Sequence, residues 1–229
     1  MGLWAIADLH LSLGADKPMD VFSGWQDYVP RLEENWRNTV SPEDTVVIAG
    51  DISWAMGLSE TEADFTFLHR LPGQKLLIKG NHDYWWTTRK KMETFFAAHG
   101  WDDLHIVHNS AFPVDGRFAV CGTRGWFYDA EDGADRRILL REAERLRTSV
   151  RAARDTGLEP VCFLHYPPVY GDMVCREITD VLKEEGITRL YYGHIHGAGI
   201  RRALNGGWEG IAMRLLSGDA VGFMPQRIP

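Results

Sequence analysis

The 229-residue chain contains only three cysteines, and their spacing fits neither a metal cluster nor a disulfide framework. Cys121, Cys162 and Cys175 are odd in number and form no Cys-x-x-Cys pair. Structural zinc clusters and disulfide-rich folds need paired or closely spaced cysteines, so both classes are disfavoured. We expect three small buried thiols in a reducing compartment, which predicts a cytoplasmic protein.

The sequence also lacks long apolar runs, a targeting segment and an excess of positive charge. No apolar run reaches the roughly 18 residues that a membrane-spanning helix needs. No basic segment or cleavage site precedes the first predicted strand, so no secretion signal is expected. The formal net charge of −7 disfavours extended binding of nucleic acid, although local cations could still hold a small anion.

No linker, low-complexity tract or internal repeat divides the chain. Because 45% of the residues are hydrophobic, the chain can bury a full core, and we predict one domain over residues 1–229. Apolar runs typical of buried strands occur at 3–7, 46–49, 75–79, 160–164 and 189–192.

Helical spacing of apolar residues separates these runs, which indicates an α/β fold. The expected helices span 24–39, 59–71, 89–99, 135–153 and 174–185. Ser59 and Glu62 have the spacing of a capping box. Short antiparallel strands are expected at 104–107, 111–114, 117–121, 199–204, 207–211 and 213–217, with a hairpin turn at Asp115-Gly116.

Polar residues that bind metals or move protons follow five of the predicted strands. They are Asp8 and His10, Asp51, Asn81-His82-Asp83, His165, and His194 with His196. Taken singly, each motif has an ordinary interpretation as a turn, a helix cap or a surface imidazole. However, five of the nine histidines lie in these segments, and the carboxyl ends of strands in an α/β sheet can converge on one cleft. Strand alternation would also direct Asp8 and His10 to the same side.

The residue types in this set predict a metal site. Histidine with Asp and Asn, and without Cys, suits borderline divalent ions such as Mn, Fe, Co or Zn. The number of groups is about what two ions need when one carboxylate bridges them. Two ions roughly 3.5–4 Å apart can activate a water molecule and direct it at phosphorus, so the sequence predicts in-line phosphoester hydrolysis.

The sequence resembles the calcineurin-like metallophosphoesterases in an ordered set of motifs: Asp8-x-His10, Gly50-Asp51, Gly80-Asn81-His82-Asp83, His165 and Gly193-His194-Ile195-His196. The resemblance implies a four-layer α/β/β/α sandwich of two mixed sheets flanked by helices. It also implies two metal sites that share Asp51. One would be completed by Asp8, His10 and His196, and the other by Asn81, His165 and His194.

The resemblance further implies that His82 faces the substrate, stabilises developing charge and protonates the leaving oxygen. One departure affects this residue. The protein Ser/Thr phosphatase branch has a second acid three residues after the bridging Asp, where this chain has Trp54. Specificity for phosphoproteins is therefore not supported, and Asp83 is the candidate that orients His82.

The predicted substrate is a small phosphomonoester or phosphodiester, such as a nucleotide, contacted by His82, Asn81 and Arg124. The Arg124 guanidinium can clamp a phosphate oxygen, or it can form a structural ion pair. The nearby aromatic residues can stack a planar group or belong to the core, and the loop Asp129–Asp135 is a candidate lid. The aromatic residues are Tyr84, Trp85, Trp86, Trp126, Tyr128, Tyr166 and Tyr170.

Two alternative functions are a metal-dependent nuclease and a non-catalytic scaffold of the same fold, as in the retromer subunit. The acidic balance argues against the first, and the complete set of ligand positions argues against the second. Because histidine ligands bind metal only when neutral, metal affinity is expected to fall as pH drops through their ordinary pKa near 6.5.

Overall fold

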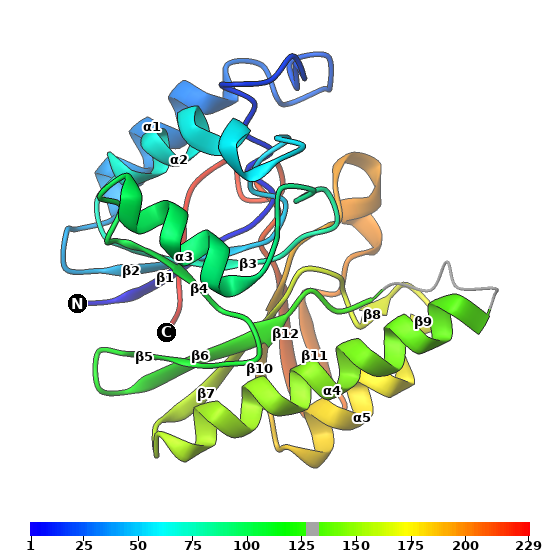
Figure 1. Cartoon of the computed structure of the whole chain (residues 1–229). Coiled ribbons are helices and arrows are strands. Elements are labelled where there is room, and N and C mark those ends of the chain that lie inside the picture. Colours follow the sequence, from blue (N-terminus) through cyan, green and yellow to red (C-terminus); the bar gives the residue numbers. More distant parts are fainter. Residues whose placement is uncertain (127–132) are drawn as a thin grey trace.

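The computed structural model describes residues 1–126 and 133–229, and two β-sheets pack face to face between layers of helices (Figure 1). The first sheet has the strand order β13-β1-β2-β3-β4. Its neighbouring strands are parallel except for β13, which runs antiparallel to β1. The strands are β1 (Leu3–Ile6), β2 (Thr45–Ala49), β3 (Gln74–Ile78), β4 (Leu104–Ile106) and β13 (Gln226–Arg227).

The second sheet has the order β11-β12-β10-β7-β6-β5, with a parallel centre and an antiparallel strand at each edge. Its strands are β5 (Phe112–Val114), β6 (Phe118–Thr123), β7 (Glu159–Leu164), β10 (Arg189–Tyr192), β11 (Gly206–Trp208) and β12 (Ile211–Leu215). A separate hairpin consists of β8 (Val169–Tyr170) and β9 (Met173–Val174).

Helices cover the outer face of each sheet (Figure 1). Those on the first sheet are α1 (Tyr28–Thr39), α2 (Glu62–His69) and α3 (Arg89–Ala98), and those on the second are α4 (Gly133–Asp155) and α5 (Arg176–Glu184). The predicted four-layer α/β/β/α sandwich of two mixed sheets is confirmed. The candidate lid Asp129–Asp135 lies outside the described residues, apart from 133–135 at the start of α4, and so does Tyr128.

The alternation of apolar side chains along β2 explains why both faces of the first sheet are buried. Val46 and Ile48 join the cluster under helices α1 to α3. Val47 and Ala49 point the other way and join the cluster between the two sheets. Successive side chains of a strand point to opposite faces, so an uninterrupted apolar run is required in a strand covered on both sides.

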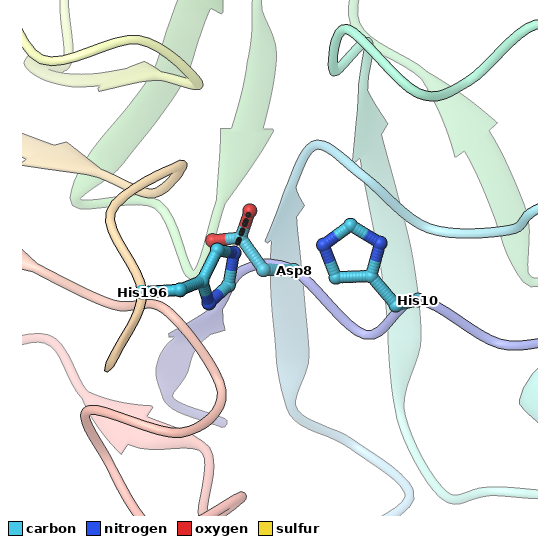
Figure 2. Close-up of side chains that lie close together, drawn as sticks. All are labelled: Asp8, His10 and His196. Atoms are coloured by element: carbon cyan, nitrogen blue, oxygen red, sulfur yellow. Dashed lines mark ion pairs between the residues drawn. The ribbon is translucent and has the colours of Figure 1, made fainter. Parts of the chain in front are cut away.

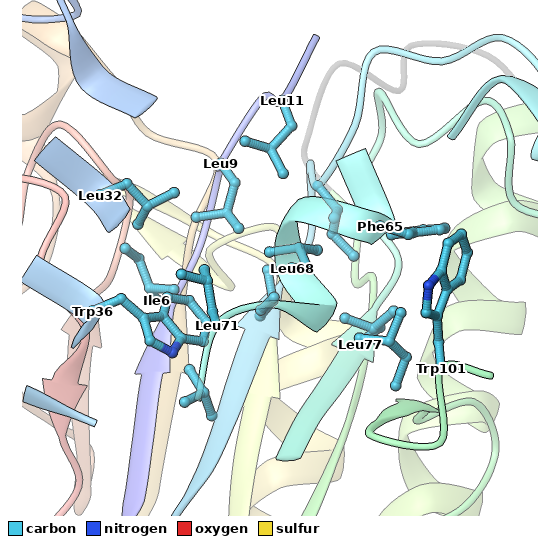
Figure 3. Packing of buried hydrophobic residues seen from close by; sticks show 14 of the residues in the cluster. Ile6, Leu9, Leu11, Leu32, Trp36, Phe65, Leu68, Leu71, Leu77 and Trp101 are labelled. Atoms are coloured by element: carbon cyan, nitrogen blue, oxygen red, sulfur yellow. The ribbon is translucent and has the colours of Figure 1, made fainter. Parts of the chain in front are cut away.

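Figure 3 shows the packing on the helix side of the first sheet. Leu32 and Trp36 of α1 and Leu68 of α2 lie over Ile6 of β1 and Leu77 of β3. All five side chains are fully buried. Burial of large apolar side chains stabilises a fold by about 1.5–3 kcal/mol each. This packing holds the ends of the central strands in place.

Some predicted pairings are wrong. Residues 199–204 do not form a strand, because the chain makes the 3-10 helix η2 (Gly197–Arg202), which begins at Gly197 in the left-handed region (φ 53°). Strand β4 is parallel to β3, and β12 is parallel to β10. In the first case α3 is a crossover helix, which returns the chain to the end of the sheet where β3 begins, so that β4 runs in the same direction as β3. In the second, β11 forms the antiparallel edge outside β12.

The capping box at Ser59 and Glu62 is also wrong. Ser59 lies inside the 3-10 helix η1 (Leu58–Thr61), and α2 begins at Glu62 without a side-chain cap. The carboxylate of Glu60 accepts a hydrogen bond from the Met56 amide instead (2.9 Å). The hairpin turn predicted at Asp115-Gly116 does connect β5 and β6.

No helix in the described part of the chain is long and apolar enough to cross a membrane.

Candidate metal centre

The loops after β1, β2, β3, β7 and β10 meet at one end of the two sheets. The sheets are joined at this end by a hydrogen bond from the Ala7 amide to the Leu216 carbonyl (2.9 Å) and by a bridge between Ala7 and Ser217. Strands of both sheets therefore deliver side chains to the same place, as the sequence predicted.

The first group of candidate ligands consists of Asp8, His10 and His196 (Figure 2). One ligand atom from each lies within 4.8 Å of the others. Asp8 Oδ1 is 3.3 Å from His196 Nε2, and this ion pair is drawn dashed in Figure 2. Asp8 is fully buried, and its carboxylate also accepts the His194 backbone amide (2.9 Å to Oδ2).

The second group consists of Asp51, His165 and His194, with ligand atoms in the same distance range. Asn81 completes this group, because its Oδ1 lies 2.6 Å from His165 Nε2 and 3.0 Å from His194 Nδ1. His194 and His196 therefore belong to different groups, although they are only two residues apart.

Asp51 connects the two groups. Its Oδ2 lies 3.7 Å from His10 Nε2, a member of the first group, and 3.4 Å from His165 Nε2, a member of the second. Its Oδ1 accepts the His82 backbone amide at 2.8 Å. The carboxylate is thus fixed in orientation and faces nitrogen ligands on both sides, as a bridging ligand must.

Several site residues have left-handed backbone conformations, which non-glycine residues rarely adopt. The φ angles are 59° at Asp8, 44° at His10, 50° at Asp51 and 72° at His194. Strand β1 ends at Ile6, so these turns, and not strand alternation, orient Asp8 and His10. Each such conformation costs roughly 1 kcal/mol or more, and strain of this kind is concentrated at functional sites.

Two glycines of the motifs are required by close contacts. A Cβ atom on Gly80 would lie 2.1 Å from Asp51 Oδ1, and one on Gly193 would lie 2.5 Å from Asp8 Oδ2. Any larger side chain would displace a carboxylate ligand. The glycines therefore let strands of both sheets approach the centre.

Burial and neighbouring charges shift the protonation of the site. Burial lowers the pKa of His10 and of His194 to about 3, so both rings are neutral. Burial also disfavours a charged His196, but the Asp8 carboxylate and the hydrogen bond to Asp219 outweigh it and raise its pKa to about 10. Burial, together with the charge of Asp8, raises the pKa of Asp51 to about 8.

The donor set fits divalent cations. Two buried acids, Asp8 and Asp51, lie among the ring nitrogens of four histidines, a set of oxygen and nitrogen donors that suits divalent cations. His196 Nε2 is buried and makes no well-aligned hydrogen bond to any described residue. One centre could be held by Asp8, His10, Asp51 and His196, and the other by Asp51, Asn81, His165 and His194.

His82 lies beside the first group and is half-buried. Its ring centroid is 5.7 Å from that of His10 and 4.5 Å from that of Trp54. The hydroxyl of Tyr84 lies 3.4 Å from its Nδ1. Burial, together with the neighbouring His165, lowers the pKa of His82. Trp54, which stands at the sequence position of the second acid of the phosphatase branch, therefore packs against this ring.

Asp83 does not contact the ring that it was expected to orient. Its fully buried carboxylate accepts hydrogen bonds from five N–H groups, and no hydrogen bond in the described structure joins it to the His82 imidazole. The donors are the amides of Gly80, Asp51, Ile52 and Ser53 and the indole of Trp85. These contacts tie the β2 loop to the β3 loop and so hold Asp51 in place.

Arg124 is engaged with other protein groups. Its guanidinium lies 3.7 Å from the buried carboxylate of Glu142 and 4.7 Å from the ring centroid of Trp126. Its carbonyl accepts the His165 amide (3.1 Å) and the Tyr166 amide (2.9 Å). These contacts support the ion-pair interpretation, and a role in substrate binding stays a prediction.

The remaining aromatic candidates have different surroundings. Trp85 belongs to the core and packs against Phe65, and Trp86 packs against Trp85. Tyr84 is 52% exposed and lies beside His82, as described above. The ring of Tyr166 lies 4.3 Å from that of His194. Trp126 contacts Arg124, and the Tyr170 hydroxyl bonds the Gly199 carbonyl.

Asp219 is a site residue that the sequence reasoning missed. Its carboxylate lies 2.9 Å from His196 Nδ1 and accepts the Gly197 amide (2.8 Å). A carboxylate behind a ligating histidine orients the ring and increases its basicity. Asp219 follows β12 in Ser217-Gly218-Asp219, so the same pattern of an acid after a buried strand could have revealed it.

The model of the calcineurin-like phosphoesterase family (Metallophos) matches residues 1–198. The chain belongs to this family. The matched segment contains all members of both ligand groups together with Asn81 and His82. The family predicted from the sequence is confirmed by this match.

Two curated relatives are similar over shorter segments. Gene 66 protein of Mycobacterium phage D29 is 37% identical over 81 residues, which are 35% of this chain and 40% of that protein. The acyl-carrier-protein phosphodiesterase PptH of Mycobacterium tuberculosis is 30% identical over 96 residues, which are 42% of this chain and 25% of that protein. The chain thus aligns with less than half the length of either relative.

Two solved structures have a similar fold. The crystal structure of phosphopantetheinyl hydrolase (PptH) from Mycobacterium tuberculosis has a TM-score of 0.54 at 15% identity and covers 99% of this chain and 95% of that chain. The crystal structure of TT1561 from Thermus thermophilus has a TM-score of 0.59 at 12% identity and covers 99% of this chain and 97% of that chain. These similarities agree with the observed four-layer sandwich.

Proposed function

We propose that this chain hydrolyses a small phosphoester with the help of two divalent cations. The observation that carries the proposal is the position of Asp51, whose Oδ2 lies 3.7 Å from His10 Nε2 of one group and 3.4 Å from His165 Nε2 of the other. Two ligand groups that share one carboxylate are suited to a pair of ions. Such a pair, when bound, neutralises phosphate charge and lowers the pKa of a water molecule for in-line attack.

The protein residues have separate tasks in this proposal. Asp8, His10, His165, His194 and His196 complete the two centres, and Asn81 contributes its amide oxygen to the second. The imidazole of His82 donates a hydrogen bond to a phosphate oxygen or to the leaving oxygen, where negative charge develops. Because burial lowers its pKa below the ordinary value of 6.5, the protonated fraction of His82 falls as pH rises towards neutrality.

Both phosphomonoesters and phosphodiesters, nucleotides among them, fit this chemistry. The name of the relative PptH, a phosphodiesterase, favours a diester. Ligands of histidine and carboxylate type suit Mn, Fe, Zn or Co. The net charge of −7 disfavours a nucleic acid, whose phosphates would be repelled, so we propose a small substrate.

The test is hydrolysis of p-nitrophenyl phosphate and bis-p-nitrophenyl phosphate by protein loaded with Mn²⁺, with a chelator as control. We expect metal-dependent release of nitrophenol, faster from the diester, and its loss in Asp51→Asn. Full activity in Asp51→Asn would contradict the proposal. Parallel incubation with single-stranded and duplex DNA would identify a nuclease, and failure to cleave any of these compounds would favour a scaffold.

A further inference from the structure

A cavity of about 460 Å³ opens beside the first ligand group. It is lined by the rings of His10, His82 and His196 and by the apolar side chains of Met19, Trp25 and Trp54. Cavities of roughly 300–1,000 Å³ with apolar walls and a few polar groups are typical of small-molecule sites. This cavity is large enough for an organic group next to the metal centre.

The apolar wall is in direct contact with the site. Trp54 stacks on His10 with ring centroids 5.0 Å apart and lies 4.5 Å from His82. Trp25 contacts His10 at 5.6 Å and His196 at 5.5 Å. A group bound against these indoles therefore also touches the ring proposed to assist the leaving oxygen.

The wall is held in position by the surrounding chain. The amide of Trp54 donates to the Leu11 carbonyl (2.9 Å), and its indole N–H points to the Met19 sulfur (3.4 Å). The ring of Trp25 packs against Tyr28 (5.1 Å) and Phe223 (4.9 Å). The cavity is thus preformed, which reduces the entropy lost when a ligand binds.

Apart from its three histidines and Ser23, the described lining carries no polar side chain other than the Trp54 indole and the Trp25 indole. Among the described residues around the cavity, none is a lysine, arginine, aspartate or glutamate. The indole N–H of Trp54, which could otherwise bond a polar ligand, is directed at the Met19 sulfur. Phe22 lines the same cavity and is 55% exposed, so its ring offers apolar surface to a ligand.

We propose that this cavity binds the organic part of the leaving group, and that the preferred substrate is a phosphoester of an aromatic or alkyl alcohol. The proposal rests on the proposed function, because it places the leaving oxygen beside His82. An aromatic ring or alkyl chain on the leaving alcohol fills the space between Trp25, Trp54 and Met19. A short alcohol leaves this space empty, and a charged alcohol loses its hydration there without gaining a partner.

The test compares ethyl phosphate with 2-phenylethyl phosphate, whose alcohols have similar acidity and differ in apolar size. With Mn²⁺-loaded protein we expect kcat/KM for phosphate release to be at least tenfold higher for the phenylethyl ester. The ratio should fall severalfold in Phe22→Ala and in Met19→Gln. Val21→Ala is the matched control, because Val21 is 73% exposed and does not line the cavity, and it should keep the wild-type ratio.

Binding separates this inference from the proposed function. Calorimetry with the non-hydrolysable ethylphosphonate and 2-phenylethylphosphonate should show tighter binding of the phenylethyl compound. This result is expected whether or not the protein hydrolyses the corresponding esters. Absence of hydrolysis of these monoesters and of both nitrophenyl esters, together with preferential binding of the phenylethyl compound, would overturn the proposed function and support the cavity. Equal kcat/KM and equal affinity for the two compounds, or ratios unchanged in both Phe22→Ala and Met19→Gln, would overturn the inference.

Discussion

The two groups of candidate ligands have similar donor atoms, but the partners behind their histidines differ. In the first group His196 Nδ1 lies 2.9 Å from the carboxylate of Asp219. In the second group His165 Nδ1 lies 3.1 Å from the Ala49 carbonyl, a neutral acceptor. A carboxylate stabilises a protonated imidazole much more than a carbonyl does. The first group therefore holds a proton that a cation must replace, whereas the histidines of the second are neutral.

The surroundings of the two groups differ as well. His10 and His196 of the first group contact Trp25 and face the apolar cavity. The second group lies against Asn81, whose amide contacts both of its histidines. This difference assigns recognition of the organic group to the first centre.

Loss of the shared carboxylate should have the largest effect, because it affects both groups. We expect Asp51→Asn to reduce kcat by about 1,000-fold or more, since removal of an essential group in a preorganised charged site costs several kcal/mol. Metal analysis should show fewer bound ions than in the wild type. Asp155→Asn, at the exposed end of α4, is the control and should have no effect. An unchanged metal content and rate would show that Asp51 bridges nothing.

Removal of His82 should reduce the rate without removing metal, because its ring belongs to neither group. General acid assistance contributes about 100–10,000-fold, so His82→Ala should lower kcat by at least about 100-fold for a poor leaving group. The loss should be smaller for p-nitrophenol, which leaves without protonation. His99→Ala, on an exposed ring, is the control. A loss that is the same for both leaving groups would argue against proton donation.

The pH dependence of metal binding should reveal the protons held by His196 of the first group and by Asp51, which connects the two groups. The pKa of His196 is raised to about 10 and that of Asp51 to about 8, so both carry a proton at pH 6 in the metal-free protein. Each proton that a cation displaces makes affinity rise by up to about tenfold per pH unit. Titrations with Mn²⁺ at pH 6 and pH 8 should show tighter binding at pH 8 and release of protons.

The sequence predicted that metal affinity falls at low pH because histidine ligands with an ordinary pKa near 6.5 become protonated. The structure assigns the protons to other groups. The pKa values of His10 and His194 are lowered to about 3, so neither ring loses a proton near pH 6.5. The titrating groups are His196 and Asp51. Equal affinity at pH 6 and pH 8 would contradict this assignment of the protons.

The smallest expected effect concerns the partner of His196 alone. Substitution of a residue that orients a ligating histidine typically costs about 10–100-fold in metal affinity. We expect Asp219→Ala to weaken one of two binding events by this factor, and Asp219→Asn, which retains an oxygen acceptor, to weaken it less. Competition with a fluorescent chelator would resolve the two events. Equal weakening of both would mean that the groups are not independent.

Local patterns placed the candidate ligands at strand ends, and the structure brings them together there. Asp51 and His165 each follow an apolar run within two residues. Because such a run forms a buried strand, the polar residue after it lies at the carboxyl end of the sheet. The same holds for the sandwich itself, since alternating strands and helices need layers on both faces of each sheet.

The contacts that orient these residues were not predictable from local patterns. Asp83 bonds the Asp51 amide across 32 positions of sequence, and His196 meets Asp219 only after β11 and β12 have folded. The position of Trp54 against His82 likewise depends on how the two loops pack. Such tertiary distances follow from the packing of the two sheets and are not encoded in any single motif.

The most direct test of the account is anomalous diffraction from crystals of the protein grown with Mn²⁺. We expect two manganese peaks in the anomalous difference map, one among Asp8, His10 and His196 and one among Asp51, His165 and His194, with the Asp51 carboxylate in contact with both. A single peak, or peaks that Asp51 does not touch, would contradict it.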